Sequence, residues 1–211
     1  MPDLVHTTEC AKEEALSCVR CSLSETRAQV VWGSGPANAM VVFVGEAPGK
    51  NEDLGGKPFI GAAGKILDEF LLSAGLSRDN IYITNVVKCR PPKNRNPLAE
   101  EIAACSDYLT VQLDLIKPVI VVALGRFAAQ TLLDADCKVD VPMKDIQGTV
   151  FQLEQFKLLP VYHPAATLYN PKMKEPFFAA AIILKQALVT SCHSECSAQH
   201  VVEGSLDSER T

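Results

Sequence analysis

Short apolar runs rich in Val and Ile recur along this 211-residue chain, and helical patterns separate them. Parallel strands need long crossover connections, which are usually helices, so this alternation predicts a mainly parallel sheet with helices on both faces. The fold class is therefore α/β. The strand-like runs are 40–44, 81–87, 119–124 and 158–162, and helical spacing of apolar residues covers 62–75, 98–115, 125–133 and 176–189.

The length and the 47% hydrophobic content suit one compact domain, which we place at 18–189. Residues 1–17 form an N-terminal extension, and the polar residues 190–211 are predicted to be a disordered tail. Residues 134–148 are expected to form an irregular connection. The chain has no apolar run long enough to span a membrane. Its first residues lack the apolar core of a secretory signal peptide.

The net charge of −5 argues against a nucleic-acid partner, but the distribution of charge does not. The segments 1–17 and 190–211 each carry a net charge of −3, which leaves +1 for residues 18–189. Within that domain, the motif KCRPPKNRNP places four cations close together without an acid between them: Lys88, Arg90, Lys93 and Arg95. Local potential steers a polyanion more than net charge does, so this proline-rich loop is a candidate for phosphate contacts.

Four cysteines stand at positions that suggest a metal centre: Cys18, Cys21, Cys89 and Cys105. Without a secretory signal the thiols are expected to stay reduced, which favours metal ligation over disulfides. Their spacing leaves zinc open as an alternative. Cys10 and Cys137 are interpreted as ordinary thiols, and the group Cys192, His193, Cys196 and His200 in the polar tail as an accidental cluster.

Polar motifs follow the predicted strands, where ligands bind in open α/β sheets. The first, GEAPGKNED, does not fit a Walker loop, because only three residues separate Gly45 from Gly49. Its acids, Glu46, Glu52 and Asp53, suit water activation instead. A loop-capping role for Glu46 and solvated roles for the other two remain open.

Three further residues suggest recognition of a planar ligand. Phe59, among small residues, is a candidate for stacking, with core packing as the alternative. Asn85, at a strand end, offers an amide that suits the edge of a base, although it could equally cap a turn. His163 follows the last predicted strand and has either a structural or a catalytic role. Next to it, Leu168 and Tyr169 are candidates for wedging into a base stack, or else for packing.

Taken together and in this order, the segments resemble the type-4 (family 4) uracil-DNA glycosylases, the iron–sulfur branch of that superfamily. The resemblance runs from about residue 18 to 188 and rests on CVRC, VGEAPGKNED, GKPFIGAAGKILDEFL, YITNVVKCRPPKNRNP, EIAAC, ALGRFAAQTLL and YHPAATLYNP. It implies a three-layer α/β/α sandwich around a four-stranded, mainly parallel sheet. Glu46 argues against the type-5 branch, which lacks a polar residue in the first motif.

The resemblance also implies residue roles. Cys18, Cys21, Cys89 and Cys105 match the ligands of a 4Fe-4S cluster. Phe59 matches the residue that stacks on uracil, Asn85 the residue that reads its edge, and His163 the histidine near uracil O2. Classical members of the superfamily have an Asp where this chain has Ala47, a position beside the base. The group that orients the attacking water must therefore come from elsewhere, and the first candidate is Glu46 and the second is Glu52. Leu168 and Tyr169 lie in the segment that enters the minor groove.

The implied function is excision of uracil from DNA, single- or double-stranded, by a monofunctional glycosylase that leaves an abasic site. We expect a monomer in the cytoplasm, associated with the nucleoid. Two alternatives remain open: a metal-stabilised DNA-binding protein without catalysis, and a superfamily member that acts on other deaminated bases.

Overall fold

A computed structural model gives the fold of the protein and describes residues 4–133 and 142–202, with side chains from 9 to 190 within these ranges. Its centre is one sheet in the order β2-β1-β3-β5-β4. Strands β1, β2, β3 and β5 are parallel, and β4 pairs with β5 in the antiparallel sense. The strands are β1 (Val41–Gly45), β2 (Tyr82–Asn85), β3 (Ile120–Leu124), β4 (Phe151–Gln152) and β5 (Lys157–Val161).

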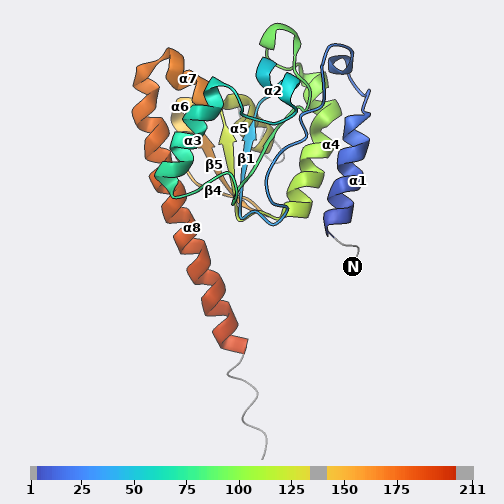
Figure 1. Ribbon diagram of the computed structural model, residues 1–211. Coiled ribbons are helices and arrows are strands. Elements are labelled where there is room, and N and C mark those ends of the chain that lie inside the picture. Colours follow the sequence, from blue (N-terminus) through green and yellow to red (C-terminus); the bar gives the residue numbers. More distant parts are fainter. Residues whose placement is uncertain (1–3, 134–141, 203–211) are drawn as a thin grey trace, which may run out of the picture.

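Helices cover both faces of this sheet, so the predicted α/β/α sandwich is confirmed (Figure 1). The main helices are α1 (Leu4–Leu16), α3 (Ala62–Ala74), α4 (Ala99–Ile116), α5 (Arg126–Leu133) and α8 (Lys174–Val202). Shorter ones are α2 (Lys50–Gly55), α6 (Met143–Ile146) and α7 (Pro164–Tyr169), with 3-10 turns η1 (Ser22–Glu25), η2 (Pro92–Asn94) and η3 (Pro171–Met173). None of the described helices is both long and apolar enough to cross a bilayer.

Strand β1 shows how the sequence fills both layers. Val41 and Phe43 pack towards α3 and α8, whereas Val42 and Val44 pack towards α4 and α5. Successive side chains of a strand point to opposite faces, and all four are almost completely buried. A continuous apolar run is therefore what a central parallel strand requires.

The structure adds three features to the predicted scheme. The predicted sheet had four strands, but the two-residue strand β4 adds an antiparallel edge, too short to leave a periodic pattern. The segment 1–17 is largely the helix α1, which packs on α4 and buries Ala15. Helix α8 continues to Val202, where the sequence predicted a disordered tail. Cys137 and the side chains of Cys192, His193, Cys196 and His200 lie outside the described residues.

Candidate active site and cysteine centre

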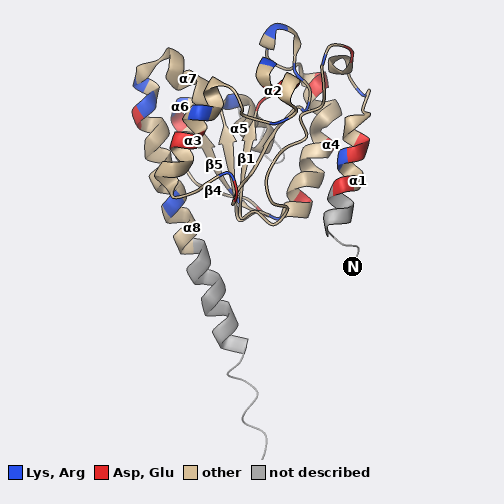
Figure 2. Cartoon of the chain, in the orientation of Figure 1, with Lys and Arg blue, Asp and Glu red and all other residues tan. Residues whose placement is uncertain are grey.

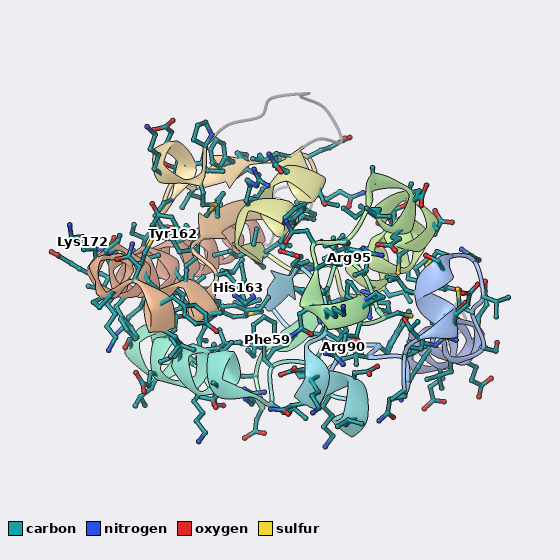
Figure 3. All side chains as sticks on the ribbon, turned by 90° about the horizontal axis from the view of Figure 1, so that it is seen from above. Phe59, Arg90, Arg95, Tyr162, His163 and Lys172 are labelled. Carbon is teal, nitrogen blue, oxygen red and sulfur yellow. The ribbon has the colours of Figure 1, made fainter. Side chains whose placement is uncertain are left out.

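A pocket of about 500 Å³ lies at the carboxyl end of the parallel strands. Seen from this end, Phe59 and His163 lie near the middle, and Arg90 and Arg95 lie to one side (Figure 3). The pocket brings together most of the residues that the sequence singled out. Those that line it are Glu46, Ala47, Glu52, Phe59, Asn85, Arg95, His163, Leu168 and Tyr169.

Phe59 and Asn85 meet above Gly45, the last residue of β1. A Cβ atom at Gly45 would lie 2.4 Å from Asn85 Oδ1 and 2.7 Å from the Phe59 ring, so only glycine fits there. Asn85 pairs with Gly45 in the sheet and is 1% exposed. Its Oδ1 atom is buried without a hydrogen-bond partner in the structure. A buried acceptor left unpaired is costly, which marks this atom as a site for a ligand's donor.

His163 caps the short helix α7 and faces the same pocket. Its Nδ1 accepts a hydrogen bond from the backbone N–H of Ala165 at 3.2 Å, so the proton of the neutral ring is on Nε2. Burial lowers the pKa of His163 to about 4, although Glu52 opposes the shift. The ring centroids of His163 and Phe59 are 5.7 Å apart. His163 is therefore a neutral hydrogen-bond donor at physiological pH.

Glu46 follows β1 directly and is partly buried in the pocket wall. Burial raises its pKa, and the positive charge of Arg126 acts in the opposite direction. Arg126 is the first residue of α5 and follows the third strand, but it was not among the residues predicted for the site. The signal was its position after β3, at the edge of the sheet where the other motifs also collect.

The other two acids of this motif hold the surrounding loops. Glu52 Oε1 accepts hydrogen bonds from the backbone N–H groups of Ile60 and Gly61, at 3.0 and 2.9 Å. Asp53 is 5% exposed and accepts one from the backbone N–H of Ala28 at 2.9 Å. Asp53 is thus not the solvated residue that the sequence left open.

The prediction that Lys88 belongs to a continuous basic surface patch is wrong. Lys88 is 1% exposed, and its Nζ donates to Thr84 Oγ1, the Asn85 carbonyl and Gln112 Oε1 at 2.6–2.7 Å. Burial lowers the pKa of Lys88 to about 7, against the influence of Cys105 and Cys89. With its donors used inside the protein, Lys88 is not available to a DNA phosphate.

The remaining cations of the loop lie at the surface to different degrees. Lys93 is exposed, and Arg90 is partly buried with its Nε donating to Asn94 Oδ1 at 2.7 Å. Arg95 forms a bidentate pair with the fully buried carboxylate of Glu101, at 2.8 and 2.6 Å. This pair ties the loop to helix α4 and partly neutralises Arg95.

Leu168 and Tyr169 lie at the end of α7, on a short helix rather than a loop tip. Both are exposed, Tyr169 to 87%, on the rim of the pocket. Lys and Arg side chains occur at this end of the molecule, together with acidic side chains (Figure 2). The rim around the pocket therefore combines exposed apolar side chains with nearby cations such as Lys93.

The four predicted cysteine ligands line one small cavity between the end of α1, the loop after β2 and helix α4. Cys89 and Cys105 are buried, and burial raises the pKa of Cys89 to about 11 and that of Cys105 above its usual range. Arg27 Nη1 lies 3.5 Å from Cys89 Sγ, and the Lys88 N–H 3.4 Å from Cys105 Sγ. Among the described side chains, no three His, Cys, Asp or Glu groups are placed to hold a single metal ion.

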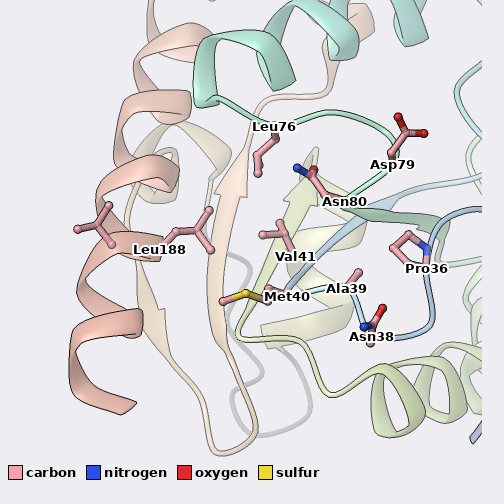
Figure 4. A pocket seen from close by; sticks show the side chains of 10 residues that line it. Pro36, Asn38, Ala39, Met40, Val41, Leu76, Asp79, Asn80 and Leu188 are labelled. Carbon is pink, nitrogen blue, oxygen red and sulfur yellow. The ribbon is translucent and has the colours of Figure 1, made fainter. Parts of the chain in front are cut away.

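Another cavity, of about 660 Å³, lies at the opposite end of the sheet, between the start of β1 and helix α8 (Figure 4). Apolar side chains such as Met40, Leu76 and Leu188 line most of it, and Asp79 is the titratable residue among them. Without a set of converging polar groups, this cavity lacks the features of a catalytic site.

Comparison with known proteins agrees with this geometry. A model of the uracil DNA glycosylase superfamily matches residues 32–184. The type-4 uracil-DNA glycosylase of Archaeoglobus fulgidus is 48% identical over 168 residues, which cover 78% of this chain and 84% of the relative. That of Sulfurisphaera tokodaii is 44% identical over 169 residues (78% and 77%). A type-5 enzyme of Pyrobaculum aerophilum is 33% identical over 178 residues (76% of each). The chain therefore belongs to the uracil DNA glycosylase superfamily, and within it to the type-4 family.

Proposed function

We propose that this protein is a uracil-DNA glycosylase that takes uracil out of the helix and hydrolyses its N-glycosidic bond. The observation that carries this proposal is the unpaired Oδ1 of Asn85, buried beside the Phe59 ring in the pocket. An acceptor next to an aromatic face suits the N3–H group of uracil. The type-4 relatives are named as uracil-DNA glycosylases, which supports the same substrate for this protein.

Base recognition divides between three side chains. The DNA must unstack the target nucleotide, at a cost of a few kcal/mol. Phe59 then stacks on the extruded base, and Asn85 reads its edge through the amide. His163 donates from Nε2 towards uracil O2, because its Nδ1 is occupied by the Ala165 N–H. Ala47 lies beside the base and offers little bulk.

Bond cleavage develops negative charge on uracil and positive charge on the sugar. The neutral His163 stabilises the leaving anion by a hydrogen bond, and its site is organised before the reaction. Glu46 stabilises the cationic sugar and positions the attacking water, as a carboxylate in the pocket wall can. Glu52 has a smaller part in this step, since its Oε1 already binds two backbone N–H groups.

DNA binding is assigned to the exposed rim. Lys93, Arg90 and, to a lesser degree, Arg95 contact phosphates, and Leu168 and Tyr169 support the stack that the uracil leaves. Both single- and double-stranded DNA are included in this proposal. The monomeric state and an association with the nucleoid remain part of it.

We assign a 4Fe-4S cluster to Cys18, Cys21, Cys89 and Cys105. Four thiols around one small cavity suit a cluster that is held by four cysteine thiolates. Hydrogen bonds to the sulfurs, as from Arg27 and the Lys88 N–H, are typical of such centres. When bound, the cluster would supply covalent cross-links between three segments of the chain.

The test is release of uracil from a labelled oligonucleotide, with uracil opposite G, opposite A and in a single strand. We expect free uracil and an alkali-labile abasic site in each case, and no release from a matched thymine substrate. A protein that binds these DNAs without releasing a base would instead be the non-catalytic DNA-binding alternative. Normal release by the double variant Glu46→Ala, Glu52→Ala would overturn the assignment of the acids.

A further inference from the structure

The residue assigned to stacking has an unfavourable backbone. Phe59 has a φ angle of +53°, in the left-handed region that side chains with a Cβ atom seldom adopt. Phe59 is nonetheless only 6% exposed, and its ring lies against Gly45, which Asn85 Oδ1 also approaches. A relaxed backbone at this residue would turn the ring away from these neighbours. Strained residues of this kind persist only where their surroundings hold them.

Arg78 holds the carbonyl side of Phe59 from outside the pocket. Its Nη2 donates to the Phe59 carbonyl at 2.7 Å and to the Gly64 carbonyl at 3.4 Å. Its Nε is fixed by Asp68 Oδ1 at 2.6 Å. Gly64 and Asp68 are one turn apart on α3, so the helix supplies both the orientation of Arg78 and the space for the Phe59 carbonyl. A Cβ atom at Gly64 would lie only 1.9 Å from that oxygen.

Glu52 holds the other side of the same turn. Its Oε1 accepts the N–H groups of Ile60 and Gly61, the two residues that follow Phe59. The turn is thus fixed on one side by a cation and on the other by a carboxylate. Arg78 is the more informative of the two, because it does not line the pocket.

We propose that Arg78, oriented by Asp68, is a positioning residue that holds Phe59 in its strained conformation so that the ring is ready to stack on the flipped base. The inference rests on the proposed glycosylase function and adds a residue to it. Arg78 does not touch the substrate; it acts on recognition only through Phe59.

A double-mutant cycle separates this role from a general structural one. Arg78→Met keeps the aliphatic stem but removes the hydrogen-bond donors. We expect it to slow uracil release under single-turnover conditions about tenfold, because Arg78 would no longer offset the free-energy cost of the left-handed conformation of Phe59. Arg78→Lys should recover part of the loss, because its ammonium can still reach the carbonyl. In a Phe59→Gly background, Arg78→Met should cost less than about twofold further, because glycine adopts the left-handed region freely and has no ring to orient.

Three controls accompany the cycle. Lys65→Met removes an exposed charge from α3 between Gly64 and Asp68, and should leave the rate unchanged. Affinity for DNA with an abasic site should also be unchanged in Arg78→Met, since no base then needs the ring. Melting temperatures check folding, and if Arg78→Met does not fold, Asp68→Asn and Arg78→Lys replace it in both backgrounds.

Equal losses in the Phe59 and Phe59→Gly backgrounds would overturn the inference, and so would an unchanged rate in Arg78→Met. A parallel loss of affinity for abasic DNA would make Arg78 a contact or folding residue instead, which also contradicts it. Failure of the parent protein to release uracil would overturn the proposed function itself, a result distinct from these.

Discussion

At the scale of single residues, the state of two polar atoms in the pocket decides what each side chain can offer a substrate. Asn85 Oδ1 is left without a partner, while His163 Nδ1 already has one. These two facts divide the roles, since Asn85 can accept and His163 can donate. Both follow from local backbone: Asn85 ends a buried strand, and His163 precedes the first turn of α7.

The charge state of His163 can be measured directly. We expect its ring signals in an NMR titration to change with a midpoint of about 4, because burial disfavours the imidazolium. Since the pKa is lowered on folding, this group stabilises the folded state at neutral pH, and that contribution is lost as pH falls below the unfolded value of about 6.5. The signal is assigned by its absence in His163→Gln, and a midpoint near 6.5 would contradict the prediction.

Glu46 should set the acid limb of the pH profile. The carboxylate is the active form and burial raises its pKa, so kcat/KM should fall with decreasing pH already above the ordinary glutamate value of 4.5. Glu46→Gln should be slower at neutral pH by at least about 100-fold, as for loss of a general base, and should lack this limb. His163 titrates too low to account for it. An unchanged limb in Glu46→Gln would assign the profile to another group.

At the scale of elements, the segment after β2 contains two kinds of cation that look alike in the sequence. Lys88 is turned inward by Thr84 and Gln112, which come from β2 and α4. Lys93 lies on the exposed turn η2. A run of basic residues therefore gives the local charge but not the direction of each side chain.

This difference predicts two separable phenotypes. Lys93→Ala should reduce the slope of log affinity for DNA against log salt by about 1, as for one lost phosphate contact. Lys88→Met should leave the slope unchanged and instead lower the melting temperature, because Gln112 and the Asn85 carbonyl lose a partner. Binding titrations at several salt concentrations, with thermal melts, measure both. A lower slope in Lys88→Met would instead show that Lys88 contacts a DNA phosphate.

The sequence predicted the parallel strands and main helices because apolar periodicity decides them. It also predicted most of the residues that line the pocket, since they follow strands that end at one edge of the sheet. Contacts between distant segments were not predictable. Phe59, with its positive φ, lies in a turn that Arg78 and Glu52 hold by hydrogen bonds, and Lys88 is buried against a glutamine in α4. The edge strand β4 has two residues, and no periodicity exists over that length.

At the scale of the whole molecule, the cysteine centre joins parts that the sheet alone does not connect. Cys18 and Cys21 follow α1, Cys89 follows β2, and Cys105 lies in α4. Arg27 adds a second connection, from its Nη2 to the Cys18 carbonyl at 2.7 Å. The four cysteines thus bring α1 and α4 together with the loop after β2, whose cations we propose to contact DNA.

Loss of one ligand should therefore act through stability. Cys89→Ala should lose visible iron–sulfur absorbance, lower the melting temperature and weaken DNA binding together. Any fraction that still folds should cleave bound substrate at close to the normal single-turnover rate. The reason is that Glu46, Asn85 and His163 line a different pocket from the four cysteines. Absorbance, melting and single-turnover assays on the same preparation test this, with Cys10→Ala as the matched cysteine control. A rate defect in folded protein would give the centre a direct part in the chemistry.

The stretch from Asn85 to Cys89 has a consequence for how this chain can vary. One end of this stretch lines the candidate active-site pocket and the other lines the cavity of the four cysteines, and Lys88 donates to the Asn85 carbonyl between them. Its length is therefore a constraint in its own right. A one-residue insertion or deletion here would displace either the Asn85 amide from the pocket or the Cys89 thiol from the cysteine cavity, whatever residue were added.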